Sequence, residues 1–222
     1  MTKSRTIRNG TDHAIRTIRN RGAYRNLALK FPNLNICFWP KAATQRYNRG
    51  STRTLDGMAT PEIISDVTLR LAQPCDATTI AHMSKRLIEM GLPWSWTPAR
   101  VAKHIRHRDS VVLTARAGGE LTGFAIMQFS DTTAHLDLLA VDPRYERLGI
   151  GRRLVQWLEE TAITAGTFVI ALEVRATNVA ARWFYSRLGY REVRCIVGYY
   201  CRVENAVQMV RDLRVIRGRD AT

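Results

Sequence analysis

The stretch from His135 to Leu154, HLDLLAVDPRYERLGIGRRL, decides how the rest of the chain is interpreted. An apolar, strand-like run ends at Val141-Asp142-Pro143, and the chain then passes through Gly149-Ile150-Gly151 into a segment with helical spacing. Backbone N–H groups in the first turn of a helix have no intrahelical partner and lie at the positive end of its dipole, and glycine allows close approach. The stretch therefore predicts a strand, a phosphate-binding turn and a helix, and with them a phosphorylated cofactor.

The composition predicts one folded domain with an extension. The chain has 222 residues, of which 45% are hydrophobic, and this is enough for one good core. No apolar run reaches the roughly eighteen residues that span a bilayer, and no apolar segment follows the basic N-terminus. We therefore expect a soluble, cytoplasmic protein without a membrane anchor or a secretory signal.

The positive charge is concentrated near the N-terminus. Residues 1–57 hold 12 Lys and Arg against 2 acidic residues, so they carry most of the net charge of +15. They show neither helical nor strand periodicity, which predicts a disordered basic arm. Three interpretations remain open: an arm that contacts RNA or another acidic partner, an inert solvated tail, and a segment upstream of a natural start near Met58. The folded domain is expected over residues 58–222.

From Val67 onward the pattern is regular and predicts a mixed α/β sheet of order β-α-α-β-β-β-α-β-α-β-β. Thr97-Pro98 supplies a helix N-cap and a first-turn proline, Gly118-Gly119 a hairpin turn, and Gly166 a helix end. The expected strands cover 67–72, 111–116, 120–129, 134–141, 168–175, 191–196 and 204–210. The expected helices begin at 76 or 78, at 97, after the glycines and at 178, and end near 90, 107, 166 and 188.

Two blocks of the sequence resemble GNAT-type N-acetyltransferases, and the resemblance extends from Val67 to about Leu213. The family carries R/Q-x-x-G-x-G/A where this chain reads Glu146-Arg147-Leu148-Gly149-Ile150-Gly151, so Glu146 replaces the usual first Arg or Gln. The second block, LEVRATN over 172–178 followed by Phe184-Tyr185 and an LGY end, is similar to bacterial ribosomal-protein alanine N-acetyltransferases. Two shorter motifs also resemble the same subgroup: Pro93-Trp94-Ser95 and Tyr199-Tyr200.

The resemblance implies a single GNAT-like domain whose mostly antiparallel sheet splays between the strands ending at Val141 and Arg175. It implies acetyl-CoA as the cofactor, lying in that cleft with its pyrophosphate on the glycine turn. The cofactor-binding residues that it implies are Leu139, Ala140, Val141, Arg147, Leu148, Gly149, Ile150, Gly151, Arg152 and Asn178.

The same resemblance implies two catalytic residues. Direct attack of an amine on a thioester requires removal of a proton from an ammonium group and supply of one to the departing thiolate. Glu173 matches the family's general base, acting through water, and Tyr185 matches its general acid. From the residue pattern alone, Glu173 is a strand residue on the face opposite the apolar one, and Tyr185 packs in the core.

The expected acceptor is the α-amine of a protein or peptide, bound by Trp94, Trp96, Tyr199 and Tyr200. Trp94 and Trp96 have the alternative role of capping the core, and a small amine such as an antibiotic, a polyamine or an amino acid remains the alternative acceptor. The pattern leaves open whether the protein is a monomer or a homodimer.

Other function classes explain less of the sequence. A non-enzymatic RNA-binding protein accounts for the basic arm but not for the glycine turn. A dinucleotide-binding oxidoreductase would need a third glycine after Gly149 and Gly151, but this chain has Leu154 at that position. His104 and His107 lack an acidic or cysteine partner at metal-site spacing, and the four cysteines form no zinc pattern, so we expect no metal and a solvated histidine face. Asp137 is assigned no role.

Overall fold

The structure is a computed structural model that describes residues 67–214. The arm expected over residues 1–57, the proposed start at Met58 and Cys37 lie outside the described residues. Within the described part, no helix combines the length and apolarity needed to cross a bilayer.

One seven-stranded sheet organises the domain, in the order β1-β2-β3-β4-β5-β7-β6. Every neighbouring pair is antiparallel except β4 and β5, which run parallel. The strands are β1 (Thr68–Leu71), β2 (Ser110–Ala117), β3 (Glu120–Phe129), β4 (Thr133–Val141), β5 (Val169–Arg175), β6 (Arg191–Tyr200) and β7 (Glu204–Asp212). The predicted mixed sheet and its element order are confirmed.

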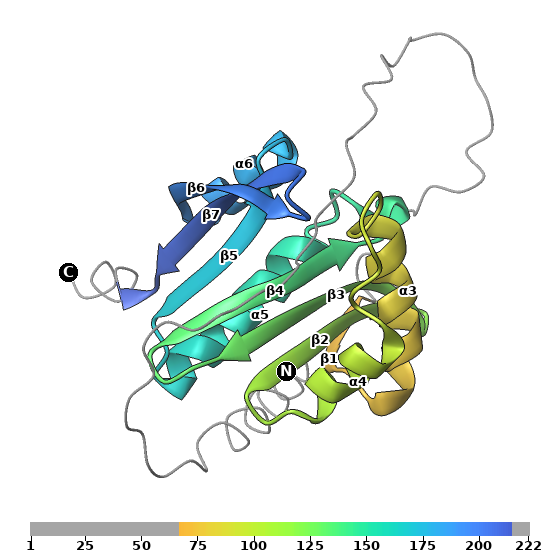
Figure 1. Cartoon of the computed structure of the whole chain (residues 1–222). Helices are drawn as coiled ribbons and strands as arrows, with labels where there is room; N and C mark the ends of the chain where they lie inside the picture. The colour runs from red at the N-terminus through yellow and green to blue at the C-terminus, as the bar shows by residue number, and fades with distance from the viewer. Residues whose placement is uncertain (1–66, 215–222) are drawn as a thin grey trace, which may run out of the picture.

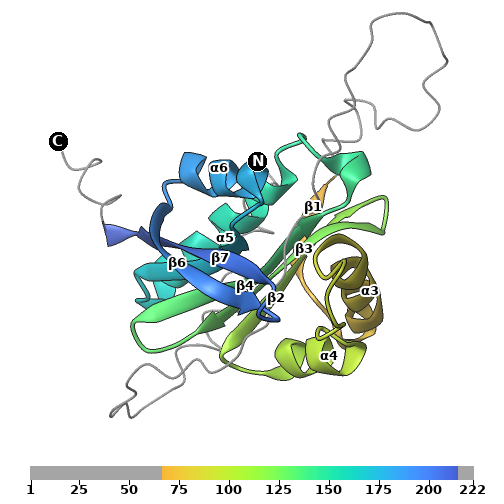
Figure 2. The ribbon, with the colours of Figure 1, turned by 45° about the horizontal axis from the view of Figure 1, so that its top comes forward.

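Within residues 67–214, four α-helices cover the two faces of this sheet (Figures 1 and 2). They are α3 (Ala77–Leu87), α4 (Pro98–Arg106), α5 (Ile150–Ala165) and α6 (Val179–Arg187). Thr97 caps α4 as predicted, since its side chain accepts the Arg100 N–H, and Gly166 ends α5 in a left-handed conformation. Two short 3-10 turns, η1 (Pro74–Asp76) and η2 (Pro143–Tyr145), were not predicted; a proline begins each.

The buried side chains form two clusters, one on each face of the sheet. The first joins α5 and α6 to Leu139, Val141, Leu172 and other residues of the strands. The second lies beneath α3 and α4 and includes Trp96 and Tyr200. Because alternate strand residues point to opposite faces, this division decides which polar side chains share a face.

Two element ends differ from the prediction by more than two residues. Helix α3 stops at Leu87 and not near Met90, because the following turn bends back so that Ile88 and Glu89 both donate their N–H to the Ser84 carbonyl. Strand β6 continues to Tyr200 and not only to residue 196, because the hairpin keeps pairing as far as Tyr200 and Glu204. The extension brings Tyr199 over the centre of the sheet.

Strand β4 carries a bulge and then separates from β5. The pairing with β3 joins Ile126 to Leu138 but Met127 to Leu136, so Asp137 is an extra residue in β4. The parallel pairing with β5 runs only from Thr133 to His135 on β4. Beyond that point the two strands diverge, as the resemblance implied, and the next residues of both strands have one edge without a strand partner in the described sheet.

Candidate active site

The chain leaves β4 through a turn that ends in an uncapped helix. Arg147 and Gly149 both have positive φ, of 63° and 77°, and Gly149 occupies the N-cap of α5 without a side-chain hydrogen bond. The first hydrogen bond of the helix runs from the Arg153 N–H to the Gly149 carbonyl. The amides of the first turn therefore have no intrahelical acceptor, which is the arrangement that binds anions.

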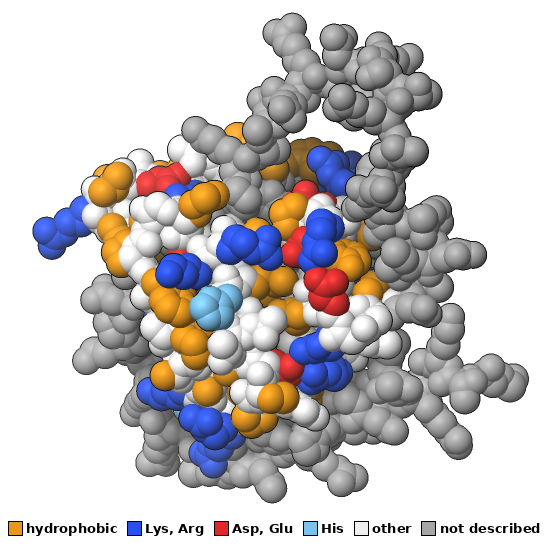
Figure 3. Space-filling model, turned by 90° about the vertical axis from the view of Figure 1, so that its right-hand side faces the viewer, with side chains coloured by type: hydrophobic (Ala, Val, Ile, Leu, Met, Phe, Trp, Pro, Cys, Tyr) orange, Lys and Arg blue, Asp and Glu red, His pale blue; other side chains and the backbone are white. Residues whose placement is uncertain are grey.

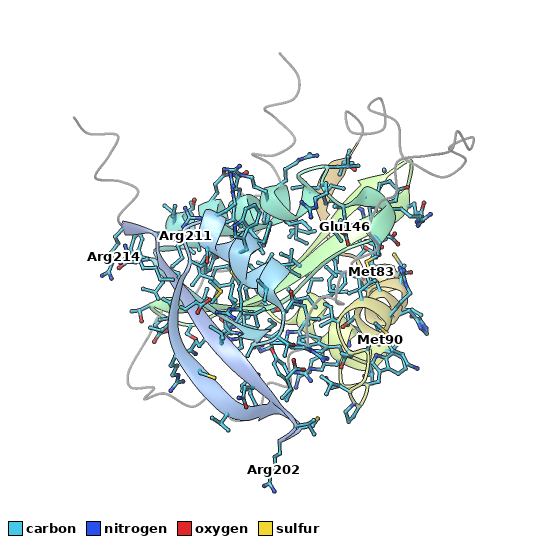
Figure 4. The ribbon with its side chains drawn as sticks, turned by 90° about the horizontal axis from the view of Figure 1, so that it is seen from above. Met83, Met90, Glu146, Arg202, Arg211 and Arg214 are labelled. Atoms are coloured by element: carbon cyan, nitrogen blue, oxygen red, sulfur yellow. The ribbon has the colours of Figure 1, made fainter. Side chains whose placement is uncertain are left out.

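Gly149 and Gly151 serve this turn for different reasons. Gly149 has a left-handed backbone that a side chain rarely adopts. Gly151 is helical, and a Cβ there would lie 3.4 Å from the nearest ring atom of Phe184, so the protein itself has room for a methyl group. Its lack of a side chain is better explained by space for a ligand than by packing. Figure 4 shows Glu146 in the approach to this turn, on the side of the molecule that carries Met83.

Glu146 departs from the family motif and is partly buried. Burial raises the pKa of its carboxyl group, although the neighbouring Arg147 opposes the rise. A carboxylate near an anion site weakens the local positive field.

Glu173 lies at the centre of a buried hydrogen-bonded cluster on the α3 and α4 face. Its Oε2 is 2.6 Å from His135 Nε2, and its Oε1 accepts a hydrogen bond from Gln208 Nε2 at 2.7 Å. Gln208 is the register partner of Glu173 across β5 and β7. From β6 of the same hairpin, the Tyr199 hydroxyl donates to Glu173 Oε2 at 3.4 Å.

His135 continues the cluster into β4. Its Nδ1 is 2.7 Å from Asp137 Oδ1, and Asp137 Oδ2 accepts from Gln128 Nε2 at 2.6 Å. Glu173 and His135 are 6% and 7% exposed, and Asp137 is fully buried. His135 is not among the site residues expected from the sequence, and Asp137 was expected to have no role. The alternation of polar His135 and Asp137 within an apolar strand was the available signal.

The carboxylates decide the charge of His135. Burial disfavours the imidazolium, but hydrogen bonds to Asp137 and Glu173 and their negative charges outweigh it and raise the pKa of His135 to about 10. In return, burial disfavours ionised Glu173, but the bond to His135 and its charge leave the pKa of Glu173 below its ordinary value. Glu173 is thus ionised at neutral pH, as a proton acceptor must be.

The other two residues expected near the cofactor lie on α6. Tyr185 is buried between the rings of Phe184 and Tyr190, whose centroids are 5.1 Å and 5.5 Å from its own. Burial raises the pKa of Tyr185, so the phenol keeps its proton. Asn178 caps α6 by accepting the Ala181 N–H at 2.9 Å. The Tyr185 ring is thus packed in the core, as its residue pattern alone predicted, and its role as general acid stays a prediction.

Two of the four residues expected to bind the acceptor are in the core. Trp96 and Tyr200 are 0% and 1% exposed, which agrees with the core-capping alternative for Trp96, and the acceptor contacts of both rings stay predictions. Trp94 and Tyr199 are half-buried, and Trp94 donates from Nε1 to the Trp96 carbonyl.

Glu89 fixes the loop that carries these tryptophans. It is buried and accepts hydrogen bonds from the Ser95 N–H at 2.6 Å, the Ser95 hydroxyl at 2.7 Å and the Trp96 N–H. The loop therefore holds Trp94 on the outside of the domain and Trp96 on the inside.

The expected solvated histidine face is wrong for His104. Its ring packs 4.8 Å from the Trp96 ring, and its Nδ1 is 3.1 Å from the Ser110 hydroxyl. Burial lowers its pKa to about 4, with only partial opposition from Asp137, so His104 is neutral. Among residues 67–214 no group of His, Cys, Asp and Glu is arranged to hold a metal ion. Cys75, Cys195 and Cys201 are free and exposed.

A cavity of about 650 Å³ lies elsewhere, between α3, the start of β3 and the turn after β4. Its lining includes Met83, Met90, Arg86 and Asp142, but none of the residues of the Glu173 cluster. Figure 3 shows this side of the molecule, where basic and acidic side chains surround an apolar hollow. The Arg86 guanidinium donates to Asp142 at 2.9 Å, so part of the charge is already paired.

Residues 81–190 match the acetyltransferase (GNAT) family. This is a GNAT acetyltransferase domain. It is 40% identical over 82 residues to the [ribosomal protein bS18]-alanine N-acetyltransferase of Escherichia coli K12. That alignment covers 37% of this chain and 55% of the E. coli protein, so it spans about half the length of the curated relatives.

Two solved structures share the fold of the GNAT domain over a longer range. The ribosomal-protein-S18-alanine N-acetyltransferase from Escherichia coli aligns with a TM-score of 0.59 and 29% identity, covering 66% of this chain and 94% of that one. Arabidopsis thaliana NAA60, crystallised in complex with acetyl-CoA, aligns with a TM-score of 0.59 and 17% identity, covering 67% and 99%. The second likeness shows the common fold.

We predict that His135→Gln destabilises the protein by about 3 kcal/mol near pH 6, because it removes the cation between two buried carboxylates. The pKa of His135 is raised from about 6.5 in the unfolded chain to about 10 in the folded protein. Protonated His135 therefore stabilises the folded state fully below about pH 6.5, and this stabilisation is lost as the pH rises through about 10. The difference in unfolding free energy between the two proteins should therefore shrink from pH 6 to pH 10. Urea denaturation at several pH values measures it, and a difference that is constant or grows with pH contradicts the prediction.

Proposed function

We propose that this protein transfers an acetyl group from acetyl-CoA directly to a primary amine, and that the amine is the N-terminal α-amine of a protein or peptide. The observation that carries the proposal is the placement of one ionised carboxylate, Glu173, on β5 where β5 has separated from β4, with an uncapped helix N-terminus at the end of β4. The first feature suits proton removal and the second suits a phosphorylated cosubstrate.

The cosubstrate is proposed to be acetyl-CoA, which supplies a thioester-activated acetyl group when bound. The first-turn amides from Ile150 to Arg152 would hold its pyrophosphate, with Arg147 and Leu148 beside them. The edge of β4 from Leu139 to Val141, which has no β5 partner, would bond its amide-containing arm. Asn178 is proposed to border that arm. The acetyl-CoA complex of NAA60, which shares the fold, supports this assignment.

The residues proposed to move protons are Glu173 and Tyr185. Glu173 is ionised and would accept a proton from the ammonium, through a water molecule, to create the nucleophilic amine. Tyr185 remains protonated and would supply a proton to the departing thiolate. Phe184, next to Tyr185, packs against Gly151, so α6 carries Tyr185 close to the proposed cofactor site.

A protein or peptide α-amine is preferred to a small amine for two reasons. The relative with 40% identity is named as an alanine N-acetyltransferase of a ribosomal protein. In addition, the Trp96 ring is 0% exposed, so it presents no surface that would favour a small planar acceptor. An α-amine with a pKa near 8 also loses its proton more readily than a lysine side chain.

We predict that the protein acetylates short peptides that begin with Ala or Ser in preference to polyamines, aminoglycosides and free amino acids. Mass spectrometry of reactions with acetyl-CoA would measure the product, and a peptide with a blocked N-terminus and an internal lysine is the matched control. If a small amine is strongly acetylated and the peptides stay unmodified, the acceptor is a small amine and the proposed peptide acceptor is wrong. Absence of acetyl transfer to every amine would refute the proposed reaction.

Glu173→Gln should lower kcat by about a hundredfold or more, since it removes a positioned base while keeping the shape of the side chain. Its acetyl-CoA affinity, measured by calorimetry, should stay close to that of the wild type. Glu160→Gln, the same change on the exposed face of α5, is the control and should keep full activity. Wild-type turnover in Glu173→Gln at neutral pH would remove Glu173 from the proposed mechanism.

Gly151→Val should abolish measurable acetyl-CoA binding, and Gly151→Ala should weaken it by about tenfold or more, because a side chain there blocks approach to the first-turn amides. The alanine variant is expected to fold, since its methyl group has room. Glu146→Gln is the companion variant in the same turn and should tighten binding, because it removes a negative charge near the phosphates. Wild-type affinity in both Gly151 variants would refute the phosphate-binding turn.

A further inference from the structure

Asp137 is a fully buried carboxylate for which the proposed reaction has no use. It is the extra residue of the β4 bulge, and such bulges redirect side chains out of the regular alternation of a strand. On either side of it, Leu136 belongs to the α5 face and Leu138 to the α3 and α4 face. Asp137 therefore lies where β4 changes its pattern, two residues from His135.

Each carboxylate oxygen of Asp137 has its own hydrogen-bond partner, one on β4 and one on β3. His135 Nδ1 approaches Oδ1 at 2.7 Å, and Gln128 of β3, the register partner of His135, donates to Oδ2 at 2.6 Å. The other ring nitrogen of His135 is 2.6 Å from Glu173. Asp137, His135 and Glu173 thus form one continuous chain of hydrogen bonds from the bulge to the proposed base.

The geometry determines how many protons this chain holds. A neutral imidazole has one N–H, but here both ring nitrogens face carboxylate oxygens at hydrogen-bond distance, which requires a proton on each nitrogen when the carboxylates are ionised. The group therefore consists of an imidazolium between two carboxylates, with a net charge of −1. Buried charges of this kind persist only when each has a close partner.

Few other charged groups face this chain. From β6 the Tyr199 hydroxyl contacts Glu173, while β3 and β7 contribute the neutral side chains of Gln128 and Gln208. From α4, Arg100 interacts electrostatically with Asp137 and with Glu89, and His104 would interact with Asp137 in the same way only when protonated. Since His104 is neutral at pH 7, Arg100 is the main cation besides His135.

We propose that Asp137 is a positioning residue of the acetyl transfer, and that it acts through His135 so that Asp137, His135 and Glu173 accept the proton of the acceptor amine as one unit. This inference rests on the proposed function and extends it. Asp137 holds the imidazole with Nε2 on Glu173 and helps to keep it protonated. Loss of that imidazolium proton leaves two carboxylates sharing one N–H, with a net charge of −2, and this form is the stronger base.

The pH dependence of the reaction follows from this arrangement. The strong-base form becomes populated only as pH rises toward the raised pKa of His135, so kcat/KM should increase with pH above neutrality. Asp137→Asn keeps the size of the side chain, and Gln128 can rotate its amide to match it. The variant leaves the imidazolium with one carboxylate partner instead of two, so the pKa of His135 should fall.

The test is the pH profile of kcat/KM for Asp137→Asn and for wild type with acetyl-CoA and one Ala-initiated peptide. The rising limb should move to lower pH by about one unit or more, and the plateau should fall by about tenfold, because the base is weaker. Acetyl-CoA affinity should remain within about twofold, since Asp137 does not border the proposed cofactor site. The amine of the peptide titrates equally in both reactions, so it cannot produce the shift.

A second measurement does not depend on activity. NMR of the free enzyme, with the His135 signals assigned by their loss in His135→Gln, should show both ring nitrogens protonated at pH 7 and a titration midpoint that falls in Asp137→Asn. A neutral His135 ring at pH 7 in wild type would overturn the proposal, even if Asp137→Asn failed to fold.

Asp76→Asn is the matched control, since Asp76 is a buried carboxylate whose partners are Arg70 of β1 and Arg116 of β2. It should lose stability but keep the wild-type pH profile. If wild type transfers acetyl groups and Asp137→Asn keeps its profile, Asp137 is structural only and the proposed function stands. If wild type transfers none, the proposed function fails, and with it the role of Asp137 in the reaction.

Discussion

The domain is organised around the point where β4 and β5 stop pairing. Three residues of each strand form a parallel ladder, and beyond His135 and Ala171 the strands diverge. Backbone N–H and C=O groups inside a protein need hydrogen-bond partners. Where β4 and β5 diverge, water or a ligand has to supply those partners. The glycine turn lies at the end of one strand and Glu173 lies on the other. The sites proposed for the anionic, amide-containing cosubstrate and for proton removal are thus brought together by one interruption in the sheet.

The polar cluster in this gap is unusual for its burial. Glu173, His135 and Asp137 are almost inaccessible, and three ionised groups in such a place are tolerated because each charge has an opposite one within 3 Å. Two neutral amides, Gln128 and Gln208, satisfy the oxygens that His135 does not reach. Strands β3, β4, β5 and β7 all contribute to the cluster, so its charge state depends on the whole centre of the sheet. A change in register at the bulge would separate Asp137 from His135.

Patterns local in sequence predicted their structures well. The alternation of strands, the Thr97-Pro98 and Asn178 helix starts, and the Gly149 and Gly166 turns all depend on neighbouring residues, and the structure has each of them. The resemblance predicted the family and the splay of the sheet. The wrong expectation concerned burial: His104 stacks on Trp96 instead of facing water. Trp96 and Tyr200 themselves lie in the core. A short motif identifies a loop but not which of its aromatic rings faces inward.

Residue types and their spacing were sufficient to determine a mixed α/β domain with a glycine turn at the start of its central helix, because backbone conformation and helix ends respond to nearby residues. They were also sufficient to single out Glu173 and Tyr185 by resemblance. Only the tertiary structure joins Asp137, His135 and Glu173, since Glu173 is 38 residues from His135 along the chain and the contact depends on parallel pairing across a crossover helix. The same is true of charge: the pKa of His135 is set by carboxylates from two strands, and no property of residue 135 in the sequence reveals it.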